Sequence, residues 1–256
     1  MARWRCSGPS RTRAASTPRP TGWRCRTSPK TRSSTRSATS CWPTVGNQSR
    51  SAKKYKFLVI ASPAGNYFKS GVPAVSIWVS GEYTRAAPGG TGAAKCGGNY
   101  AASLVPQANA IARGHDQVVF LDAAEHKWIE ELGGMNLFFV FDDGSLVTPP
   151  LTGTILPGIT RDSLIRLLRE EGLEVREEPY SIYQWREDAA SGRLLETMAC
   201  GTAAVVTPVG TVAGPDGEFT IGGGGPGQIT TKLRDKLVGI QRGRVEDTHG
   251  WVTKLS

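Results

Sequence analysis

An abrupt change of composition near Tyr55 constrains this chain more than any other feature of its sequence. Residues 1–54 hold thirteen Lys and Arg residues, no Asp or Glu, and Val45 as the only Leu, Ile, Val or Phe. A stretch with so few aliphatic side chains cannot bury enough apolar surface to offset the entropy lost on folding. We therefore predict a basic, disordered segment over residues 1–54 and one folded domain over residues 55–256.

The charge of the chain is divided at the same boundary. The 256 residues carry 31 Lys and Arg against 22 Asp and Glu, a net charge of +9. Without the thirteen basic residues of the first segment, 18 basic residues face 22 acidic ones, which is a net charge of −4. A basic surface for nucleic acid is therefore not expected on the domain.

Several other classes of protein are disfavoured by what the sequence lacks. No run of eighteen apolar residues and no apolar signal-peptide region is present, so we expect neither a membrane span nor secretion, and a cytoplasmic location. The five cysteines form no C-x-x-C pair, and the three histidines are scattered. Neither a disulfide framework nor a metal site is predicted.

From residue 55 onward, short apolar runs alternate with amphipathic segments, which predicts a mixed α/β (α+β) domain. The predicted strands are Phe57–Ala61, Val75–Val79, Val118–Leu121, Leu137–Phe141, Glu174–Glu178 and Ala203–Val209. The predicted helices are Tyr100–Arg113, Arg161–Glu171, Ile182–Ser191 and Thr230–Gln241. In the second of these helices, Thr160 is the expected N-cap and Gly172 the expected C-terminal stop. Asp142–Gly144 has the chemistry of a hairpin turn.

The most unusual local sequence is a single lysine, Lys95, set among glycines and small residues at positions 89–103, just before a predicted helix. Small flanking residues let the backbone approach a flat ligand closely. The segment matches neither the phosphate-binding G-x-x-x-x-G-K-[ST] pattern nor G-x-G-x-x-G. A partly buried lysine in such a place can be nucleophilic and can form a Schiff base with a carbonyl, whereas the alternative is a glycine-rich turn with a solvated lysine.

This segment resembles the pyridoxal-phosphate lysine motif of the class IV (fold type IV) aminotransferases, and specifically that of the branched-chain amino acid aminotransferases. The resemblance runs nearly continuously from Lys54 to Ser256 and covers the large domain of that family. The further motifs that carry it, in the order of the family, are Ala61-Ser-Pro-Ala-Gly65, Gly134-Met-Asn-Leu137, Leu156-Pro-Gly-Ile-Thr160, Cys200-Gly-Thr-Ala203 and Thr248-His-Gly-Trp251.

The resemblance implies a role for each of a few residues around pyridoxal 5'-phosphate. Lys95 corresponds to the lysine that forms the Schiff base and moves the proton, and Glu131 to the carboxylate that pairs with the pyridine nitrogen. Glu130 is expected on the opposite face of the strand. Tyr100 corresponds to the tyrosine that binds the phenolic oxygen of the cofactor, and Arg85 to an arginine near its phosphate.

The remaining implied contacts concern the phosphate and the substrate. Ile159 and Thr160 open the clearest helix, where free N–H groups and the helix dipole suit an anion, and Thr202 could add its hydroxyl. Thr202 and Ala203 resemble the turn that holds the substrate carboxylate. Tyr67 resembles a wall of the apolar side-chain pocket.

The function implied by the resemblance is transfer of the amino group of leucine, isoleucine or valine to 2-oxoglutarate, which yields glutamate, in an enzyme that is normally a homodimer. A D-amino acid aminotransferase or an aminodeoxychorismate lyase shares the fold and is the alternative. A catalytically inactive remnant, or a binding protein with a basic tail, belongs to a different class of function. Absorbance of bound pyridoxal phosphate that borohydride removes would separate enzyme from binder.

One departure from the family concerns the region before Tyr55. The family carries a small α/β domain there, which supplies a phosphate-binding arginine and part of the dimer interface, whereas residues 1–54 do not resemble it. Arg, Ser, Thr, Pro, Cys and Trp without acids are what a GC-rich coding sequence gives in the wrong frame. We therefore expect that residues 1–54 are disordered or frame-shifted and that the chain without a small domain has little or no activity.

Overall fold

The computed structural model of the chain describes residues 37–38, 56–63 and 74–253, with the backbone alone at residues 37, 38 and 61. These residues belong to one compact unit, Ser34–Ser256. The predicted boundary between Lys54 and Tyr55 lies outside the described residues, and so does Tyr67.

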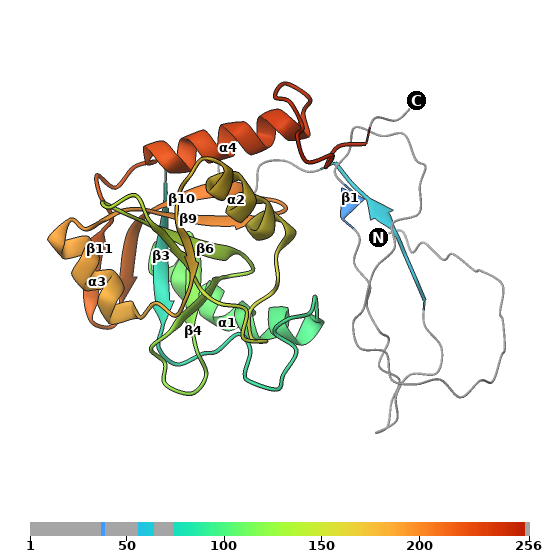
Figure 1. Cartoon of the computed structure of the whole chain (residues 1–256). Coiled ribbons are helices and arrows are strands. Elements are labelled where there is room, and N and C mark those ends of the chain that lie inside the picture. The colour runs from blue at the N-terminus through green and yellow to red at the C-terminus, as the bar shows by residue number, and fades with distance from the viewer. Residues whose placement is uncertain (1–36, 39–55, 64–73, 254–256) are drawn as a thin grey trace. The chain divides into compact units, whose positions relative to one another are not determined.

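A nine-stranded mixed sheet forms the centre of the described domain (Figure 1). In chain order its strands are β3 (Val75–Ser80), β4 (Gln117–Leu121), β5 (Ile129–Leu132), β6 (Asn136–Phe141), β7 (Leu146–Thr148), β8 (Val175–Glu177), β9 (Leu194–Gly201), β10 (Val205–Gly214) and β11 (Gly217–Thr220). Their order in the sheet is β5-β4-β3-β10-β9-β6-β7-β8, with β11 beside β10. Strand β3 runs parallel to both of its neighbours, as β7 does to β8, and the other pairs are antiparallel.

Among the described residues, three helices connect strands of the sheet and a fourth follows the last strand. They are α1 (Gly97–Ala112), α2 (Ile159–Glu170), α3 (Ile182–Ser191) and α4 (Gln228–Gln241). Two short strands outside the large sheet, β1 (Ser37–Ala38) and β2 (Ile60–Ala61), pair with each other in antiparallel register. The mixed α/β class that the sequence predicts is therefore confirmed.

Both faces of the sheet are buried where β6 crosses the domain. Leu137, Phe139 and Phe141 point into one apolar cluster, which includes Trp185 of α3. The intervening Phe138 and Val140 point into a second cluster with the buried leucines of α2 and α4. Burial on both faces explains why this strand reads as an unbroken apolar run.

The sheet curls so that β5, its end strand, meets β6. A tight turn at Gly133 and Gly134 joins the two strands, and Leu132 forms an isolated bridge with Met135. Gly133 has a φ of +59°, a conformation that glycine adopts without strain. The turn therefore brings the residues of β5 beside the start of β6.

Helix α2 begins two residues before its predicted start, and the prediction that Thr160 caps it is wrong. The N-cap is Gly158, and no side chain caps the helix. A Cβ on Gly158 would lie 2.2 Å from Oδ1 of Asn136, so a side chain at this position would require the Asn136 amide to move. The predicted C-terminal stop is confirmed, since the helix ends at Glu170 and Gly172 follows with a φ of +79°.

The other predicted elements fare differently. Five of the six predicted strands are present as β3, β4, β6, β8 and β10, and the four helices agree within three residues at each end. The predicted buried strand Phe57–Ala61 is wrong, because only Ile60–Ala61 is a strand and Phe57 is 62% exposed. An apolar run is buried only if another part of the chain covers it, and the sequence pattern does not supply that partner.

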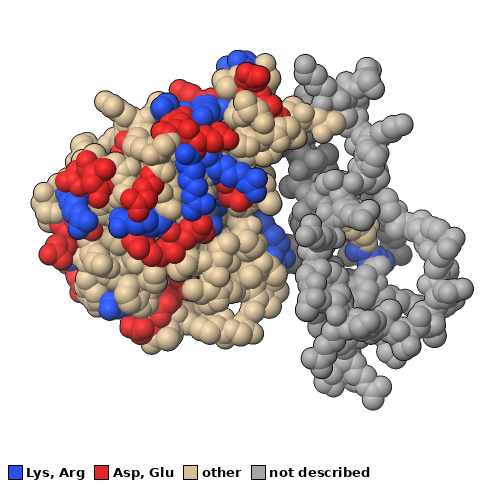
Figure 2. All heavy atoms as spheres, viewed as in Figure 1, with Lys and Arg blue, Asp and Glu red and all other residues tan. Residues whose placement is uncertain are grey.

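The surface of the described domain is unevenly charged. Figure 2 shows Lys, Arg, Asp and Glu side by side over the face that carries α2 and α4, whereas the region around α1 is largely uncharged. In α1, Leu104 and Val105 are more than half exposed. Among the described residues, no helix is both long and apolar enough to cross a membrane.

Candidate functional site

The loop that carries Lys95 is fixed by a single asparagine in the first turn of α1. The amide nitrogen of Asn99 donates to the carbonyls of Thr91 (2.8 Å) and Ala94 (3.0 Å), and its oxygen accepts from the Thr91 hydroxyl (2.7 Å). Asn99 is 5% exposed. The backbone on the N-terminal side of Lys95 is therefore tied to the helix that follows it.

Lys95 and Tyr100 form the exposed end of the site. The lysine Nζ donates a hydrogen bond of 3.0 Å to the tyrosine Oη. Both side chains are exposed, so Lys95 differs from the partly buried lysine that the sequence suggests. The tyrosine ring also lies against the turn between β5 and β6, since a Cβ on Gly134 would be 3.7 Å from it.

Glu131 and Arg85 form the buried end of the site. Nε of Arg85 lies 3.2 Å from Oε2 of Glu131, with the two side chains 6% and 1% exposed. The other carboxylate oxygen of Glu131 accepts from the backbone N–H of Leu156 at 2.6 Å. Burial raises the pKa of Glu131 to about 7, although Arg85, the Leu156 N–H and, more weakly, Lys95 act in the opposite direction.

Glu130 does not point away from Glu131 as simple alternation along a strand predicts. Phe120 pairs with Glu131 and Leu121 pairs with Ile129, so Glu130 is the extra residue of a β-bulge. Its carboxylate accepts a hydrogen bond from the Thr154 hydroxyl, two residues before the Leu156 that contacts Glu131. The bulge therefore sends both carboxylates to the same loop, and the opposite-face prediction is wrong.

Arg85 lies with this carboxylate pair. Its Nη2 donates to the carbonyls of Thr154 (2.5 Å) and Gly92 (3.2 Å), in addition to the contact with Glu131. No interaction described among residues 74–253 joins Arg85 to Ile159. The contacts support a role in holding Glu131 and give no support to the position near a phosphate that the family resemblance implied.

The start of α2 lies next to the buried end of the site. Asn136, the first residue of β6, donates from Nδ2 to the carbonyl of Leu156 at 3.0 Å. This contact joins the Gly134–Leu137 motif to the Leu156–Thr160 motif. Ile159 is 80% exposed, and the N–H groups of the first helical turn have no partner within the helix. These amides could hold an anion, as predicted for Ile159 and Thr160.

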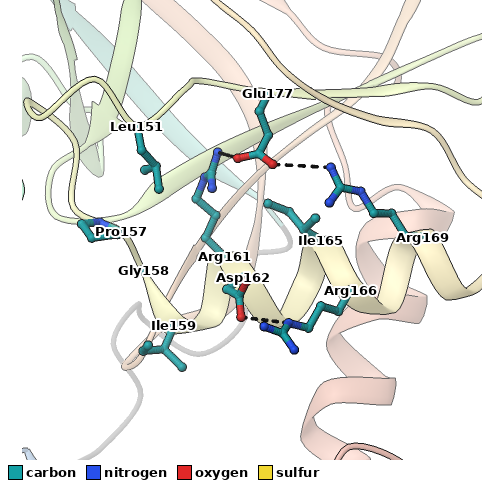
Figure 3. A pocket seen from close by; sticks show the side chains of 10 residues that line it. All are labelled: Leu151, Pro157, Gly158, Ile159, Arg161, Asp162, Ile165, Arg166, Arg169 and Glu177. Carbon is teal, nitrogen blue, oxygen red and sulfur yellow. Dashed lines mark hydrogen bonds and ion pairs between the residues drawn. The ribbon is translucent and has the colours of Figure 1, made fainter.

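A pocket of about 580 Å³ opens beside the same end of α2 (Figure 3). Three arginines line it, and each faces a carboxylate. Arg161 and Arg169 pair with Glu177 at 3.0 and 3.4 Å, and Arg166 pairs with Asp162 at 3.0 Å. The pocket does not include Lys95 or Glu131, so we regard it as a neighbour of the candidate site and not as the site itself.

Thr202 and Ala203 lie in the exposed turn between β9 and β10. Strand pairing places this turn near the start of β6. Cys200 pairs with Asn136, and a Cβ on Gly201 would be 3.3 Å from Met135. Val205, which follows the turn, has a φ of +59°, an unusual and strained value for a β-branched residue.

The structure thus brings Lys95, Tyr100 and Glu131 together around the turn between β5 and β6. Sequence reasoning missed three residues that hold them: Asn99, Asn136 and Thr154. Asn136 lies inside a motif that the sequence singles out, so a signal for it existed. Asn99 and Thr154 carry no recognisable signal, since their contacts depend on how distant loops meet.

Comparisons with known proteins agree on one family. A sequence model described as "Amino-transferase class IV" matches residues 27–212, which includes part of the basic segment. The chain is 58% identical over 210 residues to the branched-chain-amino-acid aminotransferase of Mycolicibacterium smegmatis, and 57% identical over 209 residues to that of Mycobacterium tuberculosis. These alignments cover 81% and 80% of this chain.

Solved structures give the same result. The branched-chain amino acid aminotransferase of Escherichia coli is similar with a TM-score of 0.70 and 37% identity, over 82% of this chain and 66% of that one. The Thermobaculum terrenum enzyme, solved in its PLP-bound holo form, has a TM-score of 0.62 and 30% identity, over 73% of this chain and 56% of that one. The chain spans 57% of the length of both mycobacterial relatives.

Proposed function

Because this chain belongs to the amino-transferase class IV family, we propose that it supplies the large domain of a pyridoxal-phosphate enzyme that transfers the amino group of leucine, isoleucine or valine to 2-oxoglutarate. One observation carries the proposal. A lysine amine is held 3.0 Å from a tyrosine hydroxyl, and the ring of that tyrosine lies against the turn that follows the buried carboxylate of Glu131. The names of the similar proteins support the substrate class.

The residues present fit pyridoxal phosphate chemically. An exposed amine can reach the carbonyl carbon of a ligand, and a hydroxyl beside it can bind the phenolic oxygen. The buried Glu131 accepts from Leu156 and pairs with Arg85, so its orientation is fixed before a ligand arrives. These are the groups that a pyridine ring with a phenol and an aldehyde requires.

When bound, the cofactor supplies a conjugated ring that accepts electrons from the Cα of the substrate. Nζ of Lys95 would hold the cofactor and, as the free amine, would accept and return the proton that is transferred from the Cα of the substrate. Tyr100 positions Nζ through its hydroxyl. Glu131 would accept a hydrogen bond from the protonated pyridine nitrogen on one of its carboxylate oxygens and so keep that nitrogen protonated, for which a rigid carboxylate is suited.

The anionic groups of cofactor and substrate would bind at two backbone sites. The free N–H groups at Ile159 and Thr160 would hold the phosphate, with the hydroxyl of Thr202 as an additional donor. The turn at Thr202 and Ala203 would hold the substrate carboxylate, and Tyr67 would form a wall of the apolar side-chain pocket. We further propose a homodimer located in the cytoplasm as the working form.

Reduction of the loaded protein tests this function directly. The full chain is mixed with pyridoxal phosphate, reduced with borohydride and digested, and the peptides are analysed by mass spectrometry. We expect the label on Lys95. In parallel, leucine and 2-oxoglutarate should give glutamate, at a low rate because residues 1–54 do not resemble the small domain of the family, whereas D-alanine in place of leucine should give none.

Three results would contradict the proposal in different ways. Label on another lysine would remove the site assignment. Turnover of D-alanine but not of leucine would favour a D-amino acid aminotransferase. Label on Lys95 without any turnover would favour an inactive remnant.

A further inference from the structure

Glu130 is a buried carboxylate for which the proposed reaction has no direct use. Its side chain belongs to a residue that is 5% exposed, and Oε1 accepts from the Thr154 hydroxyl. Its second oxygen, Oε2, is buried without a hydrogen-bond partner among the described residues. A buried carboxylate with one hydrogen bond costs stability, so its presence calls for a specific explanation.

Thr154 links Glu130 to the buried end of the candidate site. Its hydroxyl donates to Glu130, while its carbonyl accepts from Nη2 of Arg85 at 2.5 Å. The same arginine contacts Glu131 at 3.2 Å. The contacts therefore run from one glutamate to the other through a threonine and an arginine.

Thr154 also touches the loop that carries Lys95. A Cβ on Gly92 would lie 2.2 Å from the carbonyl oxygen of Thr154, so the two backbones meet with no room for a side chain. Nη2 of Arg85 donates to the Gly92 carbonyl as well. The position of Thr154 thus affects both the carboxylate of Glu131, through Arg85, and the loop that carries Lys95.

We propose that Glu130 is a positioning residue, which holds Thr154 and through it aligns Arg85 with Glu131. This inference rests on the proposed function for its catalytic consequence, but not for the contacts themselves. The β-bulge is what makes the arrangement available, because it places Glu130 on the same side as Glu131.

The test compares two pairs of variants in the full chain. Glu130→Ala removes the acceptor, whereas Glu130→Gln keeps an oxygen that can accept from Thr154. Thr154→Val removes the hydroxyl, whereas Thr154→Ser keeps it. Glu196→Gln is the matched control, since Glu196 also accepts from a threonine hydroxyl, that of Thr230 in α4, and has no described contact with Arg85.

The first readout is hydrogen exchange of the Nε–H group of Arg85, measured by NMR without cofactor. We expect about tenfold faster exchange in Glu130→Ala and Thr154→Val, and exchange close to wild type in Glu130→Gln, Thr154→Ser and Glu196→Gln. The second readout uses the loaded protein. Glu130→Ala and Thr154→Val should lower kcat about tenfold with an unchanged KM for leucine. Both should also alter the absorbance spectrum of the bound cofactor.

Exchange like that of wild type in both Glu130→Ala and Thr154→Val would overturn the proposal. If Glu130→Ala fails to fold, the comparison of Thr154→Val with Thr154→Ser decides the question alone. A wild-type chain that binds no cofactor would remove the proposed function, while the exchange measurement would still test the role of Glu130.

Discussion

The two ends of the candidate site are built differently. Lys95 and Tyr100 are exposed and joined by one hydrogen bond, whereas Glu131 and Arg85 are buried and held by several contacts. The lysine end sits on a loop and the first turn of a helix, and the carboxylate end sits on a strand of the central sheet. The group that must change partners during a reaction is thus the exposed one, and the group that must stay fixed is built into the core.

Substitutions at the exposed end and at the buried end of the site should differ in their effects on reaction rate and on stability. An exposed side chain can be replaced with little effect on folding, whereas a buried ion pair that loses one partner leaves an uncompensated charge. Substitutions at the two ends should therefore be distinguishable by measuring both rate and stability.

The largest effect is expected for Lys95→Ala. Loss of the amine should lower transamination of leucine about 1000-fold or more, because no other group at the exposed end can attach the cofactor. The melting temperature should change little, since the side chain is exposed. Lys232→Ala, a lysine of α4 that pairs with Glu171, is the control and should keep full activity. Full activity of Lys95→Ala would exclude the lysine role.

Glu131→Gln should lower the rate without lowering the stability of the fold. The amide cannot hold a pyridinium proton, so we expect kcat to fall about 100-fold while cofactor still binds. The folded state favours a neutral group at position 131, so the amide should leave the free energy of unfolding at pH 7 unchanged or raise it by up to about 3 kcal/mol. Steady-state kinetics and urea unfolding measure the two effects. A fall of about 3 kcal/mol at pH 7 would show instead that the charged pair with Arg85 stabilises the fold.

The stability of the cofactor-free chain should depend on pH through the same carboxylate. Burial raises the pKa of Glu131 to about 7 from 4.5, so the folded state binds more protons than the unfolded state within that window. The free energy of unfolding should therefore fall as the pH rises from 4.5 to 7, by up to about 3 kcal/mol. Urea unfolding measured between pH 4.5 and 7 should show this decrease of the free energy of unfolding with pH in wild type.

Glu131→Gln should reduce the dependence of the free energy of unfolding on pH without abolishing it. Burial also raises the pKa of Glu130, so part of the dependence should remain. Equal slopes in wild type and Glu131→Gln would mean that Glu131 does not carry a raised pKa.

The smallest effect is expected for Tyr100→Phe. This change removes the hydrogen bond from Nζ of Lys95 and should lower kcat about tenfold, which corresponds to about 1.4 kcal/mol. Stability should change by less than about 0.5 kcal/mol because the residue is 39% exposed. Tyr183→Phe in α3, which is 64% exposed, is the control. A large loss of stability in Tyr100→Phe would contradict the view that this end of the site is independent of the core.

Features that depend on neighbouring residues were predicted well. The apolar stripe of α2, the glycine that follows it and the hairpin turn at Asp142–Gly144 each arise within a few residues, and the structure contains all three. The helix after Lys95 was also predicted, although it begins at Gly97, three residues before the predicted start at Tyr100. The start of α2 was predicted incorrectly, since its N-cap is Gly158, a residue that lies against Asn136 of another element.

The sequence by itself determined the mixed α/β class, the small-residue setting of Lys95 and the apolar faces of the helices, because periodicity and turn chemistry act locally. Only the tertiary structure decided that Glu130 and Glu131 share one loop, that Arg85 joins them, and that Phe57 to Ile60 are exposed. A bulge of one residue changes the face on which a side chain lies, and the sequence pattern does not reveal it. Burial and pairing across dozens of residues depend on which surfaces meet, and that is settled only when the whole domain packs.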